Sequence, residues 1–181
     1  MSVKDIIAQV FGIIGLVVIA SSFQCKKNKK FFLMQSMGSL AFFLNFFLIN
    51  AYAGALYNVT NLIRGILFSK EDKKTWKLVL LIVLYTVCFL FSAYLIWEEW
   101  FMIFIAALPF LGLIPMTVLM WMADGKRIRY FQVAFMSPAW IVHNIFNFSL
   151  GGILCESFSM ISTIISFIRY GKDGFEKAQN A

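Results

Sequence analysis

Charged side chains are scarce in this chain: Asp, Glu, Lys and Arg make up 14% of its 181 residues, whereas 61% are hydrophobic. A soluble domain of this length needs far more polar surface to cover so much apolar side chain. A bilayer removes that need. The composition therefore excludes an ordinary soluble domain and indicates an integral membrane protein.

Histidine and cysteine, which bind metals in many proteins, are scarce as well. The chain has one histidine, and its three cysteines (Cys25, Cys88 and Cys155) form no closely spaced pair. No two acidic residues share a predicted membrane helix. We therefore predict no metal site, no cofactor and no enzymatic activity.

Long apolar stretches are abundant instead. A helix needs about 18 to 25 mostly apolar residues to cross roughly 30 Å of hydrocarbon at 1.5 Å per residue. The stretches that qualify are 6–24, 31–50, 51–68, 78–97, 100–123, 130–150 and 151–168. The sequence thus predicts an all-α, polytopic membrane protein with seven transmembrane helices.

Lysine and arginine are nearly absent from every second connection between these stretches. Fifteen of the 16 lie at the ends of the first, third, fifth and seventh stretches, and only Lys4 lies on the other side. Basic loops stay in the cytoplasm, so we expect the N-terminus outside and the C-terminus inside. The net charge of +7 then reports topology and does not indicate nucleic-acid binding.

The two halves of the chain resemble each other. A shift of 99 residues places Phe32 on Phe131 and Asn45 on Asn144, and both halves repeat the order span, basic loop, span with asparagine, outer glycine, span ending in arginine. A second three-span unit in the same orientation requires one extra crossing before it. We therefore predict a 3+1+3 parallel-repeat arrangement. Its parts are a first repeat at 1–75, a linker helix at 76–99, a second repeat at 100–170 and a cytoplasmic tail at 171–181.

Polar side chains follow one face of the third helix in each repeat. Asn58 and Asn61 are three residues apart, and Ser159 and Thr163 continue a stripe that begins at Glu156. Polar groups in lipid usually face a bundle interior or a wet cavity, so these residues are candidate substrate contacts. Ordinary hydrogen bonds between helices are the alternative.

Arg64 ends the third span near the cytoplasmic side. A side chain of this length can reach the interface, and it can also bind an anionic group of a substrate. Both interpretations remain open for Arg64.

His143 and Glu156 flank the short turn before the seventh span, so a contact between them is feasible. Low polarity favours a neutral carboxyl group, while a nearby imidazolium favours a charged one, so such a pair can exchange a proton. We predict a role in gating or proton coupling, with a purely structural pair as the alternative. Asn45 and Asn144, which the repeat aligns, are expected to make helix contacts.

Two segments carry a resemblance to a known family: "YAGALYNVTNLIR" in the first repeat and "WIVHNIFNFSLGGILCESFSMISTIISFIR" in the second. They resemble the bacterial inner-membrane YgjV family, and the resemblance covers nearly the whole chain. It implies a multi-pass protein of the bacterial cytoplasmic membrane. The 3+1+3 layout is distantly similar to SWEET sugar transporters and PnuC nicotinamide riboside transporters, whose sites lie between two three-helix bundles. The Pro-Gln dipeptide of the PQ-loop relatives is absent, so no substrate is carried over.

These features favour a transporter or facilitator of a small solute that works by alternating access between two three-helix bundles. The alternative is a membrane receptor or binding module, or a structural membrane protein, without transport. The expected partners are the lipid bilayer and an unidentified small solute, and a homo-oligomer is left open.

Overall fold

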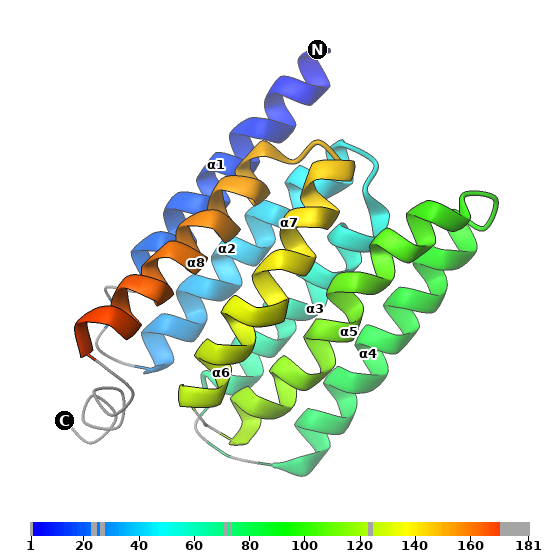
Figure 1. Cartoon of the computed structure of the whole chain (residues 1–181). Helices are drawn as coiled ribbons and strands as arrows, with labels where there is room; N and C mark the ends of the chain where they lie inside the picture. Colours follow the sequence, from blue (N-terminus) through cyan, green and yellow to red (C-terminus); the bar gives the residue numbers. More distant parts are fainter. Residues whose placement is uncertain are drawn as a thin grey trace.

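The computed structural model describes residues 2–22, 25, 28–70, 72, 74–122 and 125–170, and within them it contains helices and no strand (Figure 1). The predicted all-α class is confirmed. The predicted cytoplasmic tail, 171–181, lies outside the described residues.

Short connections join the helices. Their bounds are α1 Val3–Ser22, α2 Asn28–Leu48, α3 Tyr52–Phe68, α4 Thr75–Leu95, α5 Trp100–Met122, α6 Gly125–Phe131, the π-helical segment η1 Gln132–Met136, α7 Ser137–Phe146 and α8 Leu150–Tyr170. Because α6, η1 and α7 follow one another without a gap, they form one rod, called the α6–α7 rod below (Figure 1). The described residues thus form rods that match the predicted stretches to within a few residues, with the largest difference at the sixth, which begins at Gly125.

Four of these helices are long and apolar enough, by length and composition, to cross a membrane within the described part of the chain. They are Val3–Ser22, Lys29–Leu48, Thr75–Leu95 and Trp100–Met122, and Leu150–Ile165 is a shorter apolar helix. The outer faces of α1 and α4 are apolar as well: Val10, Val17, Val83 and Leu90 are each more than half exposed. Such a surface matches lipid, in which helices satisfy their own backbone hydrogen bonds.

The rods assemble in two groups. In the first group α2 packs between α1 and α3, and in the second group the α6–α7 rod packs between α5 and α8. The groups meet where α1 contacts α8, and α4 contacts both α3 and α5 at the other seam (Figure 1). The bundle therefore closes on itself, with space between the groups bounded by both seams.

The seam between α1 and α8 depends on two glycines. A Cβ atom added to Gly151 would overlap the backbone of Gly12, so both positions need a bare backbone. Beside them Asn45 donates to the Ala8 carbonyl at 2.7 Å and accepts from the Ser149 hydroxyl at 2.6 Å. Small residues allow this approach and the asparagine bridges three helix segments, as is typical of helix packing in lipid.

The turns after the second helix of each group share one geometry. Asn50 (φ 61°) and Phe148 (φ 54°) both have left-handed backbone conformations. The N–H groups that follow, of Ala51 and Ser149, donate at 2.9 Å to Phe46 and Asn144 carbonyls respectively. This is the Schellman pattern, repeated at an offset of 98 residues. The shift of 99 pairs Asn45 with Asn144. The offset of 98 at these turns pairs Asn45 with His143 instead.

The π-helical segment η1 lies just before Pro138. The Ser137 N–H donates to the carbonyl of Gln132, five residues earlier, and proline has no N–H to donate. A wide turn follows from this missing donor. It brings Gln132 and Ser137 onto one face, where the Gln132 amide donates to the Ser137 hydroxyl at 2.9 Å.

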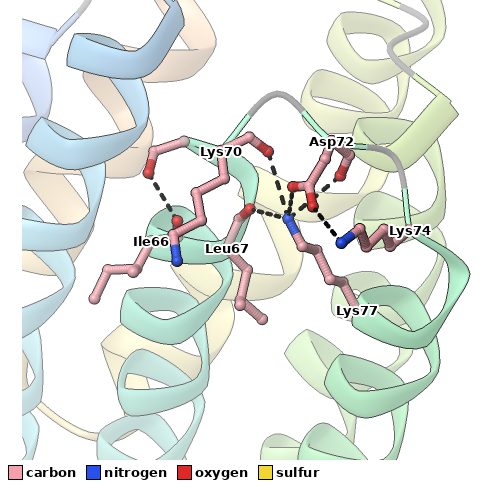
Figure 2. A network of polar contacts seen from close by, with 7 residues as sticks. Ile66, Leu67, Lys70, Asp72, Lys74 and Lys77 are labelled. Carbon is pink, nitrogen blue, oxygen red and sulfur yellow. Dashed lines mark hydrogen bonds and ion pairs between the residues drawn. The ribbon is translucent and has the colours of Figure 1, made fainter.

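Lys77 fastens the connection between α3 and α4. Its side chain is buried, and its ammonium donates to the carbonyls of Leu67 (3.0 Å) and Asp72 (3.3 Å) and to the Asp72 carboxylate (Figure 2). The Leu67 carbonyl belongs to the last turn of α3, where a cation is favoured by the helix dipole. One lysine of α4 thereby satisfies the end of α3.

We predict that Lys77→Met destabilises the protein by about 1.5–3 kcal/mol, the range for hydrogen bonds to a charged group, because the methionine keeps the stem and loses the ammonium. Lys74→Met is the control, since its side chain is 62% exposed and makes only an ion pair with Asp72. Thermal unfolding in detergent measures both variants. Equal effects of the two substitutions would contradict the assignment.

The same contact predicts an acid dependence. The hydrogen bond from Lys77 holds the pKa of Asp72 below its usual value of 3.8. A depressed pKa means that the stabilisation is complete above about pH 4 and is lost as the pH falls through the lowered value. The stability difference between the protein and Asp72→Asn should therefore shrink below pH 4, and a difference that stays constant would contradict the prediction.

Candidate functional site

A cavity of about 400 Å³ lies between the two groups of helices. The first group contributes residues of α2 and α3, and the second contributes residues of α5, the α6–α7 rod and α8. A volume of this size suits a small solute.

The polar residues predicted on the third helices line this cavity. Asn58 and Asn61 come from α3, and Ser159 and Thr163 come from α8. Glu156 and Arg64 also line it. The structure therefore places both predicted polar stripes in the lining of one cavity, although each stripe belongs to a different group.

The α3 stripe is held by hydrogen bonds to α4 and α5. Asn61 Oδ1 accepts from the Tyr85 hydroxyl of α4 at 2.7 Å. Arg64 Nη1 donates to the Thr117 hydroxyl of α5 at 3.3 Å. These side chains are oriented by neighbours, and Asn61 keeps its amide nitrogen for other partners.

Glu156 is held by the α6–α7 rod. Its Oε2 accepts from the Ser137 hydroxyl at 2.7 Å and from the Gln132 amide at 3.3 Å. Both donors are neutral. The π-helical segment makes this arrangement possible, because it places Gln132 and Ser137 side by side.

His143 does not meet Glu156. It lies five residues before Phe148, whereas Glu156 lies eight residues after it, so the two groups are at different levels of the bundle. The imidazole is 1% exposed, packs edge-on against Phe46 (5.6 Å) and Trp140 (5.3 Å), and would be 2.8 Å from a Cβ on Gly54. His143 thus belongs to the contact between the groups and not to the carboxyl site.

Asn144 lines the cavity, while Asn45 lies in the seam between α1 and α8. The Asn144 amide lies over Gly152 and is 1% exposed. Its Oδ1 accepts no hydrogen bond from the described residues. The two asparagines that were expected to act alike therefore occupy different surroundings.

Four buried rings close one end of the cavity. We call Phe46, Tyr57, Trp140 and His143 the aromatic layer. Phe46 stacks on Trp140 at 5.9 Å, and Tyr57 meets Trp140 edge-on at 6.3 Å. The Tyr57 hydroxyl donates to the Ala106 carbonyl of α5 at 3.0 Å. The layer joins the two groups across the cavity, near the turns that contain Asn50 and Phe148.

The other end of the cavity is more exposed. Gln35, Arg64, Gln132 and Thr163 line it there and are partly accessible, whereas every ring of the aromatic layer is buried. Accessibility increases toward the end of the bundle that carries the basic residues. The cavity therefore communicates with that end and is closed at the other.

Sequence reasoning missed several lining residues. Gln35 and Ser39 of α2, Arg129 of α6 and Gln132 all face the cavity. The spacing of four between Gln35 and Ser39 places both on one helical face, and that signal was available. In the described residues no group of three His, Cys, Asp or Glu side chains is placed to hold a metal ion.

A bundle of apolar helices around a cavity with several polar side chains in its lining defines a multi-pass helical membrane protein. The chain belongs to the Imp-YgjV family, described as bacterial inner membrane protein, whose model matches residues 6–173. The resemblance found in the sequence is thereby confirmed, and the protein resides in the bacterial inner membrane. Searches of curated proteins and of solved structures found no match.

The one-sided accessibility of the cavity predicts a labelling pattern. In a variant with Cys25→Ser, Cys88→Ala and Cys155→Ala, a cysteine at Thr163 should react with a membrane-impermeant thiol reagent added from the cytoplasmic side only. A cysteine at Phe148, which is 79% exposed, should react from the outside only. Reaction of both cysteines from the same side would contradict the topology, and no reaction at Thr163 would contradict an accessible cavity.

Proposed function

We propose that this protein transports a small solute across the bacterial inner membrane by alternating access. The observation that carries the proposal is the cavity between two three-helix groups, lined by polar residues from the third helix of each group and closed at one end by the aromatic layer. Transporters with internal repeats place their sites between the repeats in this manner.

In the proposal the groups are parallel repeats in a 3+1+3 arrangement, with α4 as the linker, the N-terminus outside and the C-terminus in the cytoplasm. The conformation described by the structure then faces the cytoplasm. Repeated turn geometry at an offset of 98 residues and the basic residues at one end of the bundle support this interpretation.

The outward-facing state requires the aromatic layer to separate. Its rings come from both groups, so a rocking motion breaks the stacking of Phe46 on Trp140 and the packing of His143 on Gly54. The seam at Gly12 and Gly151 brings α1 and α8 backbones together and provides a pivot. His143 acts as part of this gate.

The solute binds to the polar wall. Asn58 and Asn61 from one side, with Ser159 and Thr163 from the other, offer amide and hydroxyl groups to it. Arg64 lies closer to the cytoplasmic end and provides a cation for an anionic group. The protein carries its solute unchanged and performs no chemical reaction.

Uptake by proteoliposomes tests the proposal. Purified protein should equilibrate at least one labelled solute from a panel of sugars, nucleosides, vitamins, organic acids and amino acids, whereas a receptor would bind it without flux. Asn61→Ala should reduce uptake of that solute about tenfold or more, because a polar contact is lost from the cavity.

Two variants control for structure. Tyr85→Phe breaks the hydrogen bond to Asn61 and leaves the amide in place, and Asn147→Ala removes an asparagine outside the cavity lining. Asn147→Ala should retain uptake, and Tyr85→Phe should retain more of it than Asn61→Ala, because the amide stays in the lining and loses only one orienting partner. Binding without uptake in the unmodified protein would exclude transport, and equal losses in Asn61→Ala and Tyr85→Phe would exclude a direct contact.

Proton coupling is assigned to Glu156 alone. Its carboxyl group faces the cavity together with Arg64 and Arg129, and its hydrogen-bond partners are neutral. A pH gradient across the liposome membrane should accelerate uptake by the protein, and Glu156→Gln should abolish this response while slower uptake down the solute's own gradient persists. An unchanged gradient response in Glu156→Gln would show that the carrier is passive or is coupled elsewhere.

A further inference from the structure

The charges of the cavity are separated along its length. Glu156 lies six residues after the start of α8, and Arg64 lies twelve residues after the start of α3. Both helices begin at the matching turns, so at 1.5 Å per residue the two levels are about 9 Å and about 18 Å from the closed end. Glu156 is thus attached deeper in the bundle, and the Cα atom of Arg64 lies about 9 Å closer to the accessible end along the helix axes.

The deep end has the chemistry of a cation site. Both hydrogen bonds described for Glu156 come from neutral donors and go to Oε2, which leaves Oε1 as an acceptor. Asn144 Oδ1, buried and without a partner in the described residues, adds a second acceptor on the same wall. Phe46 and Trp140 supply ring faces, which attract ammonium groups.

The opposite charge is required at the other end. Within the described part of the chain Arg64 donates one hydrogen bond, to Thr117, from a guanidinium that has five N–H donors. Arg129 also lines the cavity, so two guanidinium groups and one carboxylate face it among the described lining residues. A simple cation can pair with Glu156 alone and a simple anion with Arg64 alone, whereas a zwitterion can pair with both.

We propose that the transported solute is a small zwitterion of the amino-acid type, bound with its ammonium group at Glu156 and its carboxylate toward Arg64. The ammonium and carboxylate of an α-amino acid are separate groups on one small molecule, so each can form charge-assisted hydrogen bonds at its own level of the cavity. Phe42, Phe46 and Trp140 accommodate an apolar or aromatic side chain. This inference rests on the proposed function and specifies its substrate class.

Equilibrium binding to the purified full chain in detergent tests it, with two matched sets of probes. One set is L-phenylalanine, 2-phenylethylamine and 3-phenylpropionate; the other is L-leucine, isoamylamine and 4-methylpentanoate. At least one zwitterion should bind, and its cationic and anionic analogues should bind at least tenfold more weakly. Failure of both zwitterions to bind, or equal binding of an analogue, overturns the proposal.

Variants assign the two ends. Glu156→Gln should weaken the zwitterion about tenfold and leave the anionic analogue unaffected or improved. Arg64→Gln should weaken the zwitterion and leave the amine unaffected, and Arg64→Lys should retain most of the affinity. A uniform loss across all three probes in either variant overturns the assignment, since it indicates a structural effect.

The outcome separates this inference from transport itself. Zwitterion binding without flux in liposomes contradicts the proposed function and leaves the binding site intact. Flux of a sugar or a nucleoside, with no zwitterion bound, contradicts the substrate class and leaves transport intact.

Discussion

Pairing of polar groups without help from bulk water is the constraint on which this structure depends. In hydrocarbon, an unpaired donor or acceptor is costly, so each polar side chain inside the bundle needs a protein partner or a wet cavity. Three hydrogen bonds meet this requirement: Tyr85 donates to Asn61, Arg64 donates to Thr117, and Ser137 donates to Glu156. The partners of the α3 residues lie on α4 and α5, whereas Glu156 is held within the second group. Because α5 belongs to the second group, Arg64 and Thr117 link the α3 wall to that group, whereas the Glu156 wall is held within its own group.

The two seams between the groups are held by different contacts. The Ala8 carbonyl accepts from Asn45, and the carbonyl 98 residues later, at Ala106, accepts from the Tyr57 hydroxyl. The first seam brings backbones together at Gly12 and Gly151. At the second, α4 packs on both α3 and α5. The two seams are thus made by different contacts.

Much of this fold follows from simple sequence patterns. Apolar stretches of the right length located the helices, since a helix in lipid satisfies its own backbone. Helical spacing placed Asn58 with Asn61, and Ser159 with Thr163, on single faces, and the repeat suggested that these faces meet. The structure places all four on one cavity.

Other features depend on packing and could not be predicted in the same way. The sequence shows that Pro138 lacks an N–H donor. It does not show that the Ser137 N–H donates to the Gln132 carbonyl to form a π-helical turn. The turns match at an offset of 98, which could be read only from their backbone geometry, so the alignment of Asn45 with Asn144 differs from it by one residue. The expected contact of His143 with Glu156 required both residues to lie equally far from the turn. In the structure His143 lies five residues before Phe148, and Glu156 lies eight residues after it. Gln35 lies on α2 and also lines the cavity, whereas the polar stripes visible in the sequence follow the third helix of each group.

The aromatic layer has an electrical consequence. A cavity that admits water from one end brings the potential of that compartment close to Glu156, so in an energised membrane the voltage falls mainly across the closed end. The level of Glu156 is about 9 Å from that end, a fraction of the roughly 30 Å hydrocarbon thickness. Transfer of one elementary charge across the full potential is worth about 2.3 kcal/mol per 100 mV. In the proposed transport cycle, a charge that leaves Glu156 through the opened layer would therefore experience most of this energy within a few helical turns. While the layer is closed, the four rings separate the two compartments at this point.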